Sequence, residues 1–300
     1  TAIDGYPMAQ QGRGGVALSI SAVSSFVGSL IAICGIILFA PLLANWSLAF
    51  GPAEYFALMV FAIACLGSMM AQNPLKSFLA ALIGLGLATV GVDANTGVYR
   101  FTFDSVHLSD GIQFVVVVIG LFSVSEILLM LESTSSGQGL VRKTGRLLFN
   151  LKEARQCAGT TLRSSFVGFF VGILPGAGAT IASAITWMME KKISGDEESF
   201  GKGNIRGVAA PEAANNASAC GSFIPMLTLG VPGSGTTAVM MGALTLYNIT
   251  PGPAMFTEQP DIVWGLIAAL LIANVMLLVM NIPLIGLFTR MLAIPSWFLV

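Results

Sequence analysis

The chain alternates between long apolar stretches and short polar connections. Two of its apolar regions, 166–190 and 208–247, are interrupted by Pro-Gly sequences. Five others approach the roughly 17–25 residues with which a helix crosses a bilayer. These stretches, nearly free of charge, are 16–43, 55–71, 78–92, 113–131 and 263–280. The pattern therefore predicts an all-α polytopic membrane protein built as a helical bundle.

Composition supports this prediction. Of the 300 residues, 55% are hydrophobic and only 10% are charged. A soluble domain of this size needs more charge to cover its surface. The net charge of −1 gives no support to a nucleic-acid partner. The four cysteines show no paired spacing, so neither a metal site nor a disulfide framework is expected.

Basic residues predict the orientation of the bundle. The positive-inside rule places a segment rich in Lys and Arg in the cytoplasm. Such a segment is 132–165, with Arg142, Lys143, Arg146, Lys152, Arg155 and Arg163. Counting back from this cytoplasmic loop puts four transmembrane helices within 1–131. A single crossing by 166–190 would then leave Lys191, Lys192, Lys202 and Arg206 outside.

A re-entrant helical hairpin over 166–190 removes this conflict. The break at 174–179 leaves the limbs 166–174 and 180–190, each about half as long as a span requires. The region 208–247, interrupted at 230–235, then crosses once as a discontinuous helix, and 263–280 returns. All of the 14 basic residues except Arg100 become cytoplasmic.

The organisation that follows has three parts. Residues 1–131 form the end of a first repeat, 132–165 the basic cytoplasmic loop, and 166–300 a second repeat. A faint similarity between TAIDG at 1–5 and TAVMMG at 237–242, on opposite sides of the membrane, indicates inverted repeats. The chain starts without Met and stops within an apolar run, so we expect truncation at both ends.

The two breaks predict a binding site. Irregular backbone at membrane depth persists only where protein surrounds it or where it lines a wet cavity, and paired interruptions indicate a transporter's site. Half-helix N-termini near Thr180 and Thr236 would attract anions. The alternative is that these small residues only permit close helix packing. The candidate substrate-binding residues are Pro175, Gly176, Ala177, Gly178, Ala179, Thr180, Asn215, Asn216, Gly233, Ser234, Gly235, Thr236 and Thr237.

Candidates for coupling to a cation are Asn215, Asn216 and Glu126. Carboxylates inside a membrane are costly and often functional. Glu126 also lies near the predicted cytoplasmic end of its span, where interfacial exposure would explain it equally well. Glu212, at the expected start of the discontinuous helix, suits either a helix-dipole role or ion coupling. Asp4 is expected in a loop.

Ordered motifs along the chain resemble the large membrane subunit of tripartite tricarboxylate transporters. They are DGYPMA at 4–9, GPAEYFAL at 51–58, GILPGAGAT at 172–180, PEAANNA at 211–217, PMLTLGVPGS at 225–234 and PGP at 251–253. The resemblance covers essentially the whole chain. The family's subunit is longer, and the N-terminal equivalent of the Pro-Gly hairpin is absent here.

The resemblance implies a secondary active transporter subunit that imports tricarboxylates or related carboxylates across the bacterial inner membrane. A Na⁺ or H⁺ gradient would drive it, and no cofactor is implied. Its partners would be a small membrane subunit and a periplasmic solute-binding protein.

Two other functions compete with carboxylate import. An anion channel or other passive permease stays open, because broken helices line pores too. An intramembrane serine hydrolase is disfavoured. A nucleophilic Ser234 would need a base within hydrogen-bond reach, and the single histidine, His107, lies in a predicted external loop.

Overall fold

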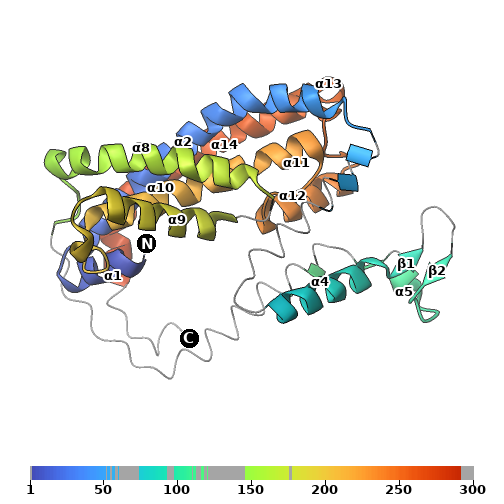
Figure 1. Ribbon diagram of the computed structural model, residues 1–300, viewed down its shortest axis with the longest axis horizontal. Coiled ribbons are helices and arrows are strands. Elements are labelled where there is room, and N and C mark those ends of the chain that lie inside the picture. The colour runs from blue at the N-terminus through green and yellow to red at the C-terminus, as the bar shows by residue number, and fades with distance from the viewer. Residues whose placement is uncertain are drawn as a thin grey trace.

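The computed structural model describes residues 2–51, 53–54, 56–57, 60, 74–92, 98–109, 111–112, 116–117, 120, 146–175 and 178–291. This part of the chain is almost entirely helical, as the sequence predicts (Figure 1). Its main helices are α1 (Ala2–Gln10), α2 (Gly14–Ser47), α4 (Pro74–Ala88), α8 (Leu151–Ile173), α9 (Gly178–Ile193), α10 (Ile205–Gly221), α11 (Phe223–Leu229), α12 (Gly235–Leu246) and α14 (Pro260–Met291). Short helices are α5 (Val106–Ser109) and α13 (Met255–Glu258), with a 3₁₀ turn at Glu197–Ser199.

Helix α10 forms the centre of the bundle and packs against α2, α8 and α9. Small residues allow the backbones to touch. A Cβ on Gly28 of α2 would lie 2.3 Å from the backbone oxygen of Ala213, and one on Gly168 of α8 would lie 2.4 Å from that of Ala214. Such close approach is typical of helix packing in membranes. Close helix packing is thus the role of Gly28 and Gly168.

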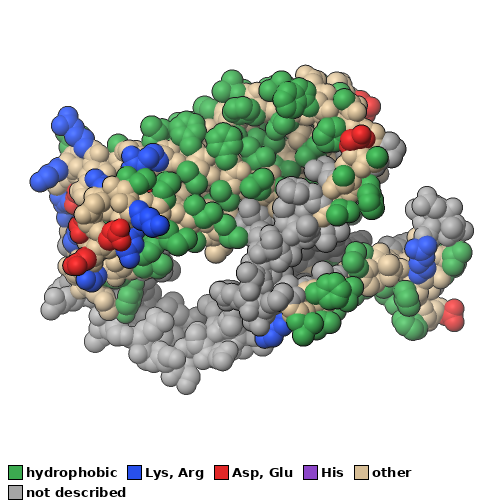
Figure 2. All heavy atoms as spheres, viewed as in Figure 1, with side chains coloured by type: hydrophobic (Ala, Val, Ile, Leu, Met, Phe, Trp, Pro, Cys, Tyr) green, Lys and Arg blue, Asp and Glu red, His purple; other side chains and the backbone are tan. Residues whose placement is uncertain are grey.

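Helices α2 and α14 are long and apolar enough to cross a membrane. Both expose large apolar side chains, including Leu38 at 71% and Val279 at 65%. Hydrophobic side chains also dominate the surface between the two ends of the bundle (Figure 2). An apolar surface of this kind fits contact with lipid.

A small antiparallel pair, β1 (Gly91–Val92) and β2 (Tyr99–Arg100), follows α4 with Gly91 opposite Arg100. The apolar blocks 55–71 and 113–131 lie almost wholly outside the described residues, as do residues 121–145. The four transmembrane helices within 1–131 and the inverted repeats therefore stay predictions.

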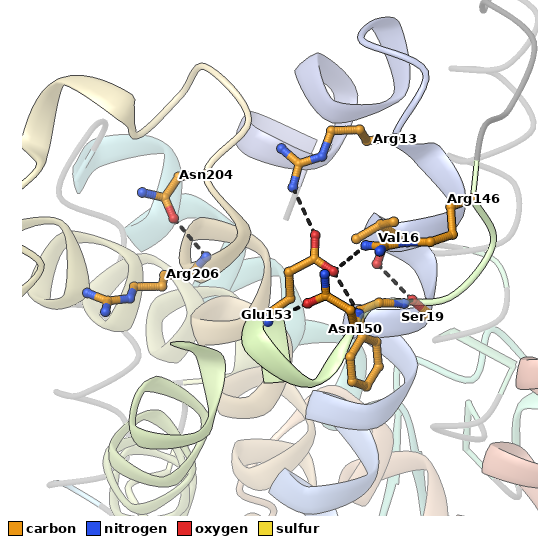
Figure 3. A network of polar contacts seen from close by, with 9 residues as sticks. Arg13, Val16, Ser19, Arg146, Asn150, Glu153, Asn204 and Arg206 are labelled. Carbon is orange, nitrogen blue, oxygen red and sulfur yellow. Dashed lines mark hydrogen bonds and ion pairs between the residues drawn. The ribbon is translucent and has the colours of Figure 1, made fainter. Parts of the chain in front are cut away.

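Helix α8 begins fifteen residues earlier than the sequence pattern suggests, so that residues 151–165, expected in the loop, are helical. Asn150 accepts a hydrogen bond from the Glu153 amide, and the Glu153 carboxylate accepts one from the Asn150 amide, each at 2.8 Å. Glu153 also pairs with Arg146 and, at 3.6 Å, with Arg13 (Figure 3). This capping box starts the helix despite its polar sequence.

Charged side chains gather at the end of the bundle that holds α1 and the start of α8 (Figure 2). Helix α9 lies beside α8 and returns towards this same end (Figure 1). Glu190 of α9 is fully buried. Its carboxylate accepts hydrogen bonds from the guanidinium of Arg163, on α8, at 2.8 and 2.9 Å. Thr160 of α8 donates to the same carboxylate at 2.9 Å. The ion pair thus joins the two limbs of a helical hairpin near its open end.

We predict that Arg163→Met lowers the free energy of unfolding of the full-length protein by about 1–3 kcal/mol, because it leaves the buried Glu190 carboxylate without its cation. Thermal unfolding in detergent measures the effect. Arg155→Met on the same helix, where the side chain is exposed, is the matched control. Equal thermal unfolding midpoints for Arg163→Met and Arg155→Met would show that the Arg163–Glu190 ion pair does not stabilise the hairpin.

Candidate functional site

The first break separates α8 from α9. Helix α8 ends at Ile173, and Leu174 is extended with φ −75° and ψ 119°. Pro175 is buried, and α9 begins at Gly178 with φ 64°, a left-handed conformation that favours glycine. Gly176 and Ala177 lie outside the described residues. The chain therefore reverses direction at the Pro-Gly sequence.

The second break separates α11 from α12. Gly230, with φ 66°, ends α11: its amide donates to the Met226 oxygen and the Val231 amide to the Pro225 oxygen, both at 3.2 Å. A left-handed residue whose amide bonds the carbonyl four residues before it forms an αL C-cap. A Cβ on Gly230 would lie 2.7 Å from the backbone oxygen of Pro251. The break is thus held by its own hydrogen bonds and by neighbouring backbone.

Helix α12 starts with a second capping box. The Thr237 amide donates to the Ser234 hydroxyl at 3.3 Å, and the Ser234 amide donates to the Thr237 hydroxyl at 2.9 Å. Both residues were predicted to bind substrate. Thr237 is buried and already committed to the cap, so its main role is to fix the helix start. Gly235 and Thr236 are exposed at this N-terminus.

The joint between α10 and α11 brings the two breaks together. A Cβ on Gly172, in the last turn of α8, would lie 2.3 Å from the Ser218 oxygen. A Cβ on Gly233, in the second break, would lie 2.8 Å from the Ser222 oxygen. The hydroxyls of Ser222 and Ser234 are 3.2 Å apart. Residues 218–222 therefore contact both interrupted regions, although the breaks are far apart in the sequence.

The predicted site residues divide by exposure. Thr180, Asn215, Gly235 and Thr236 are exposed, whereas Pro175, Gly233 and Thr237 are buried. Gly178, Ala179, Asn216 and Ser234 are half-buried. Glu126 lies outside the described residues. Asn215 and Asn216 do not lie together, because Asn216 lines a pocket with α2 and α14 while Asn215 is exposed.

This pocket has a volume of about 250 Å³ and contains polar residues that the sequence pattern missed. They are Ser21, Ser25, Asn274 and Asn281, and they line the pocket together with Glu212, which the sequence already indicates as a candidate. Each is an isolated polar residue, and only the packing of α2, α10 and α14 brings them together. Glu212 is the eighth residue of α10, beyond its first turn. An interaction with the helix dipole therefore does not explain Glu212, since that effect fades within the first turn.

Asp4 is a further residue that the sequence pattern misplaced. It is fully buried in α1, not in a loop. One carboxylate oxygen accepts from the amides of Gly201, Gly203 and Asn204 at 2.8, 3.1 and 2.9 Å. The other accepts from the Trp187 indole at 2.8 Å. Asp4 thus fastens the start of α10 to α1 and α9, which makes it a structural anchor.

Long apolar helices, a charged end and two helix breaks define a largely helical membrane protein. The whole chain, residues 1–300, matches the Tripartite tricarboxylate transporter TctA family. The chain belongs to this family, which confirms the resemblance found in the motifs.

Two relatives from Agrobacterium vitis are known only as uncharacterized proteins. One, a 52.8 kDa protein in the TAR-I ttuC' 3' region, is 43% identical over 98% of this chain and 59% of its own length. The other, in the TAR-II ttuC' 3' region, is 49% identical over 43% of this chain and 53% of its own length. These matches span little more than half of each relative. No solved structure matches.

We predict that Gly233→Ala destabilises the full-length protein by about 1–3 kcal/mol, because the added methyl group overlaps the backbone at Ser222. Gly265→Ala is the control, since nothing lies within 4 Å of a Cβ at that position. Thermal unfolding midpoints of the two purified variants compare them. A Gly233→Ala protein as stable as the control would mean that the second break is not packed on the joint.

Proposed function

We propose that this chain forms most of the transport core of a secondary active carboxylate importer of the bacterial inner membrane. Membership of the TctA family supports the substrate class. The observation that carries the mechanism is the convergence of two helix breaks on residues 218–222. The carboxylate binds where these breaks meet, and a cation gradient drives its uptake.

The chemistry of the breaks suits an anion. The first turns of α9 and α12 carry the exposed hydroxyls of Thr180 and Thr236. Helix N-termini present N–H donors and a partial positive charge, which stabilise a carboxylate. The exposed amide of Asn215, on the central helix, supplies a further donor. A carboxylate held by neutral donors can leave again, as transport requires.

The α8–α9 hairpin enters the membrane from the cytoplasmic side and returns without crossing. Three observations support this topology: α9 returns to the charged end of the bundle, Lys191 and Lys192 lie in its last turn, and the Arg163–Glu190 pair ties the limbs there. Movement of this hairpin relative to α10 would expose the substrate to each side in turn. A small membrane subunit and a periplasmic solute-binding protein complete the system and deliver the carboxylate.

A passive anion channel is the competing function. Broken helices also line pores, so the geometry alone suits both. Carboxylate uptake that saturates and accumulates substrate against its gradient distinguishes the importer from a channel, which only equilibrates it.

We predict that Asn215→Ala in the full-length protein lowers the rate of uptake of citrate, used as a tricarboxylate probe, at least about tenfold. The exposed amide contributes little to folding, so membrane insertion and thermal stability should stay normal. Uptake into cells that also express the two partner subunits is the measurement.

Asn45→Ala is the matched control, because Asn45 is an exposed asparagine on α2. It should transport like the unmodified protein. Near-normal uptake by Asn215→Ala would show that Asn215 does not bind the carboxylate.

A further inference from the structure

An apolar cavity lies between α2 and α8 and shares no residue with the candidate carboxylate site. The two helices run side by side in the same direction. Near their starts the Phe149 amide donates to the Ser19 hydroxyl at 3.2 Å, and further along the hydroxyls of Ser24 and Thr161 are 3.2 Å apart. Beside these contacts lies the cavity, with a volume of about 310 Å³. Its apolar lining includes Ile20, Val23, Val27, Ala154, Ala158 and Leu162.

The cavity lies at the depth of lipid chains. Helix α2 is one of the described helices that are long and apolar enough to cross a membrane. The cavity follows it from Ile20 to Val27, which corresponds to about 10 Å of helix. Half of a hydrocarbon core of about 30 Å is about 15 Å, so the cavity fits within the chain layer of one leaflet. It is open on one side, because Ala158 and Leu162 in its wall are exposed.

Two basic side chains lie at the end of this cavity where α8 begins. Arg155 directly follows Ala154 and is three residues before Ala158, and both alanines line the cavity. Arg155 therefore lies on the side of α8 next to the cavity. Lys152 is in the first turn of the same helix. Both basic side chains are exposed, and neither forms an ion pair with any residue that the structure describes.

The acidic residue between these two cations is already paired. Glu153 forms ion pairs with Arg13 and Arg146 (Figure 3). Its carboxylate therefore does not neutralise Lys152 and Arg155. Lys and Arg side chains gather at this end of the bundle, whereas hydrophobic side chains cover α2 and α8 beyond it (Figure 2). An excess of positive charge thus lies beside an apolar cavity.

We infer that this cavity binds an anionic phospholipid, with an acyl chain between α2 and α8 and the phosphate at Lys152 and Arg155. In a phospholipid the phosphate lies at the membrane interface, directly next to the acyl chains. Along α8 the protein presents cationic and apolar groups in this same order. Basic pockets between membrane helices recognise anionic headgroups in this way. The guanidinium of Arg can also donate two hydrogen bonds to one phosphate.

A helix of another protein is the alternative occupant. Such a helix would have to bring an acidic side chain to the level of Lys152 and Arg155, whereas every anionic phospholipid carries its negative charge at that level. The charge at the end of the cavity therefore favours the lipid. The inference does not depend on the transported solute, because it rests only on the placement of α2 and α8 in a membrane.

The test is native mass spectrometry of the purified full-length protein, titrated with phosphatidylglycerol or with phosphatidylcholine that has the same acyl chains. The unmodified protein should bind phosphatidylglycerol at least about tenfold more tightly, because Lys and Arg at a membrane surface attract anionic lipid. The double variant Lys152→Gln/Arg155→Gln should bind both lipids equally. Lys192→Gln/Lys202→Gln removes the same charge from exposed positions outside the cavity and should keep the preference.

Ala158→Phe keeps both cations and fills the cavity from an exposed position. It should weaken phosphatidylglycerol binding at least about fivefold, because the acyl chain loses its apolar contacts. The inference is overturned by equal affinities for the two lipids in the unmodified protein, by a preference that survives in Lys152→Gln/Arg155→Gln, or by unchanged binding in Ala158→Phe.

The same titration of the complex with the small membrane subunit distinguishes the two occupants. A lipid in the cavity predicts that the complex keeps the preference for phosphatidylglycerol. Loss of the preference in the complex would mean that a protein helix covers the cavity, which would also overturn the inference.

Discussion

Backbone amides and carbonyls cannot be left without partners in the hydrocarbon of a membrane, and this constraint governs the whole structure. Two helices of this chain stop at Pro-Gly sequences and resume a few residues later. At membrane depth, each interruption would free backbone groups that lipid cannot satisfy. The fold meets the constraint by placing both interruptions against α10 and its extension into α11. Close helix packing and the capping box at Ser234 and Thr237 are therefore what a broken helix requires in this environment.

The central helix also determines where polar groups can lie within the bundle. Its small residues admit α2 and α8 to within backbone contact, which leaves room for polar groups only where the packing opens. One opening, between α2, α10 and α14, is lined by serine and asparagine side chains and by Glu212. The other region, where the breaks meet, carries donors at helix N-termini. Both polar regions thus border the same central helix.

The sequence predicted the helical class, the positions of both breaks and the polar residues beside them, because Pro, Gly and apolar runs act locally. It could not predict which side of α10 each asparagine faces. Asn215 and Asn216 are adjacent in sequence, yet only Asn216 reaches the pocket with α14. Ser25 and Asn274 gave no local signal, since their role depends on contacts between distant segments. Asp4 was misplaced for the same reason, because its partners are about 200 residues away.

The central claim is that α8 and α9 enter the membrane and return to the same side, so that the first break lies inside it. The most direct test is chemical labelling of single cysteines in full-length, otherwise cysteine-free protein, from either face of the membrane. Glu198→Cys, in the exposed turn after α9, should react only from the cytoplasmic face, and Glu258→Cys, at the opposite end of the bundle, only from the periplasmic face. Reaction of Glu198→Cys from the periplasmic face would mean that the hairpin crosses the membrane, and the re-entrant topology of α8 and α9 would be wrong.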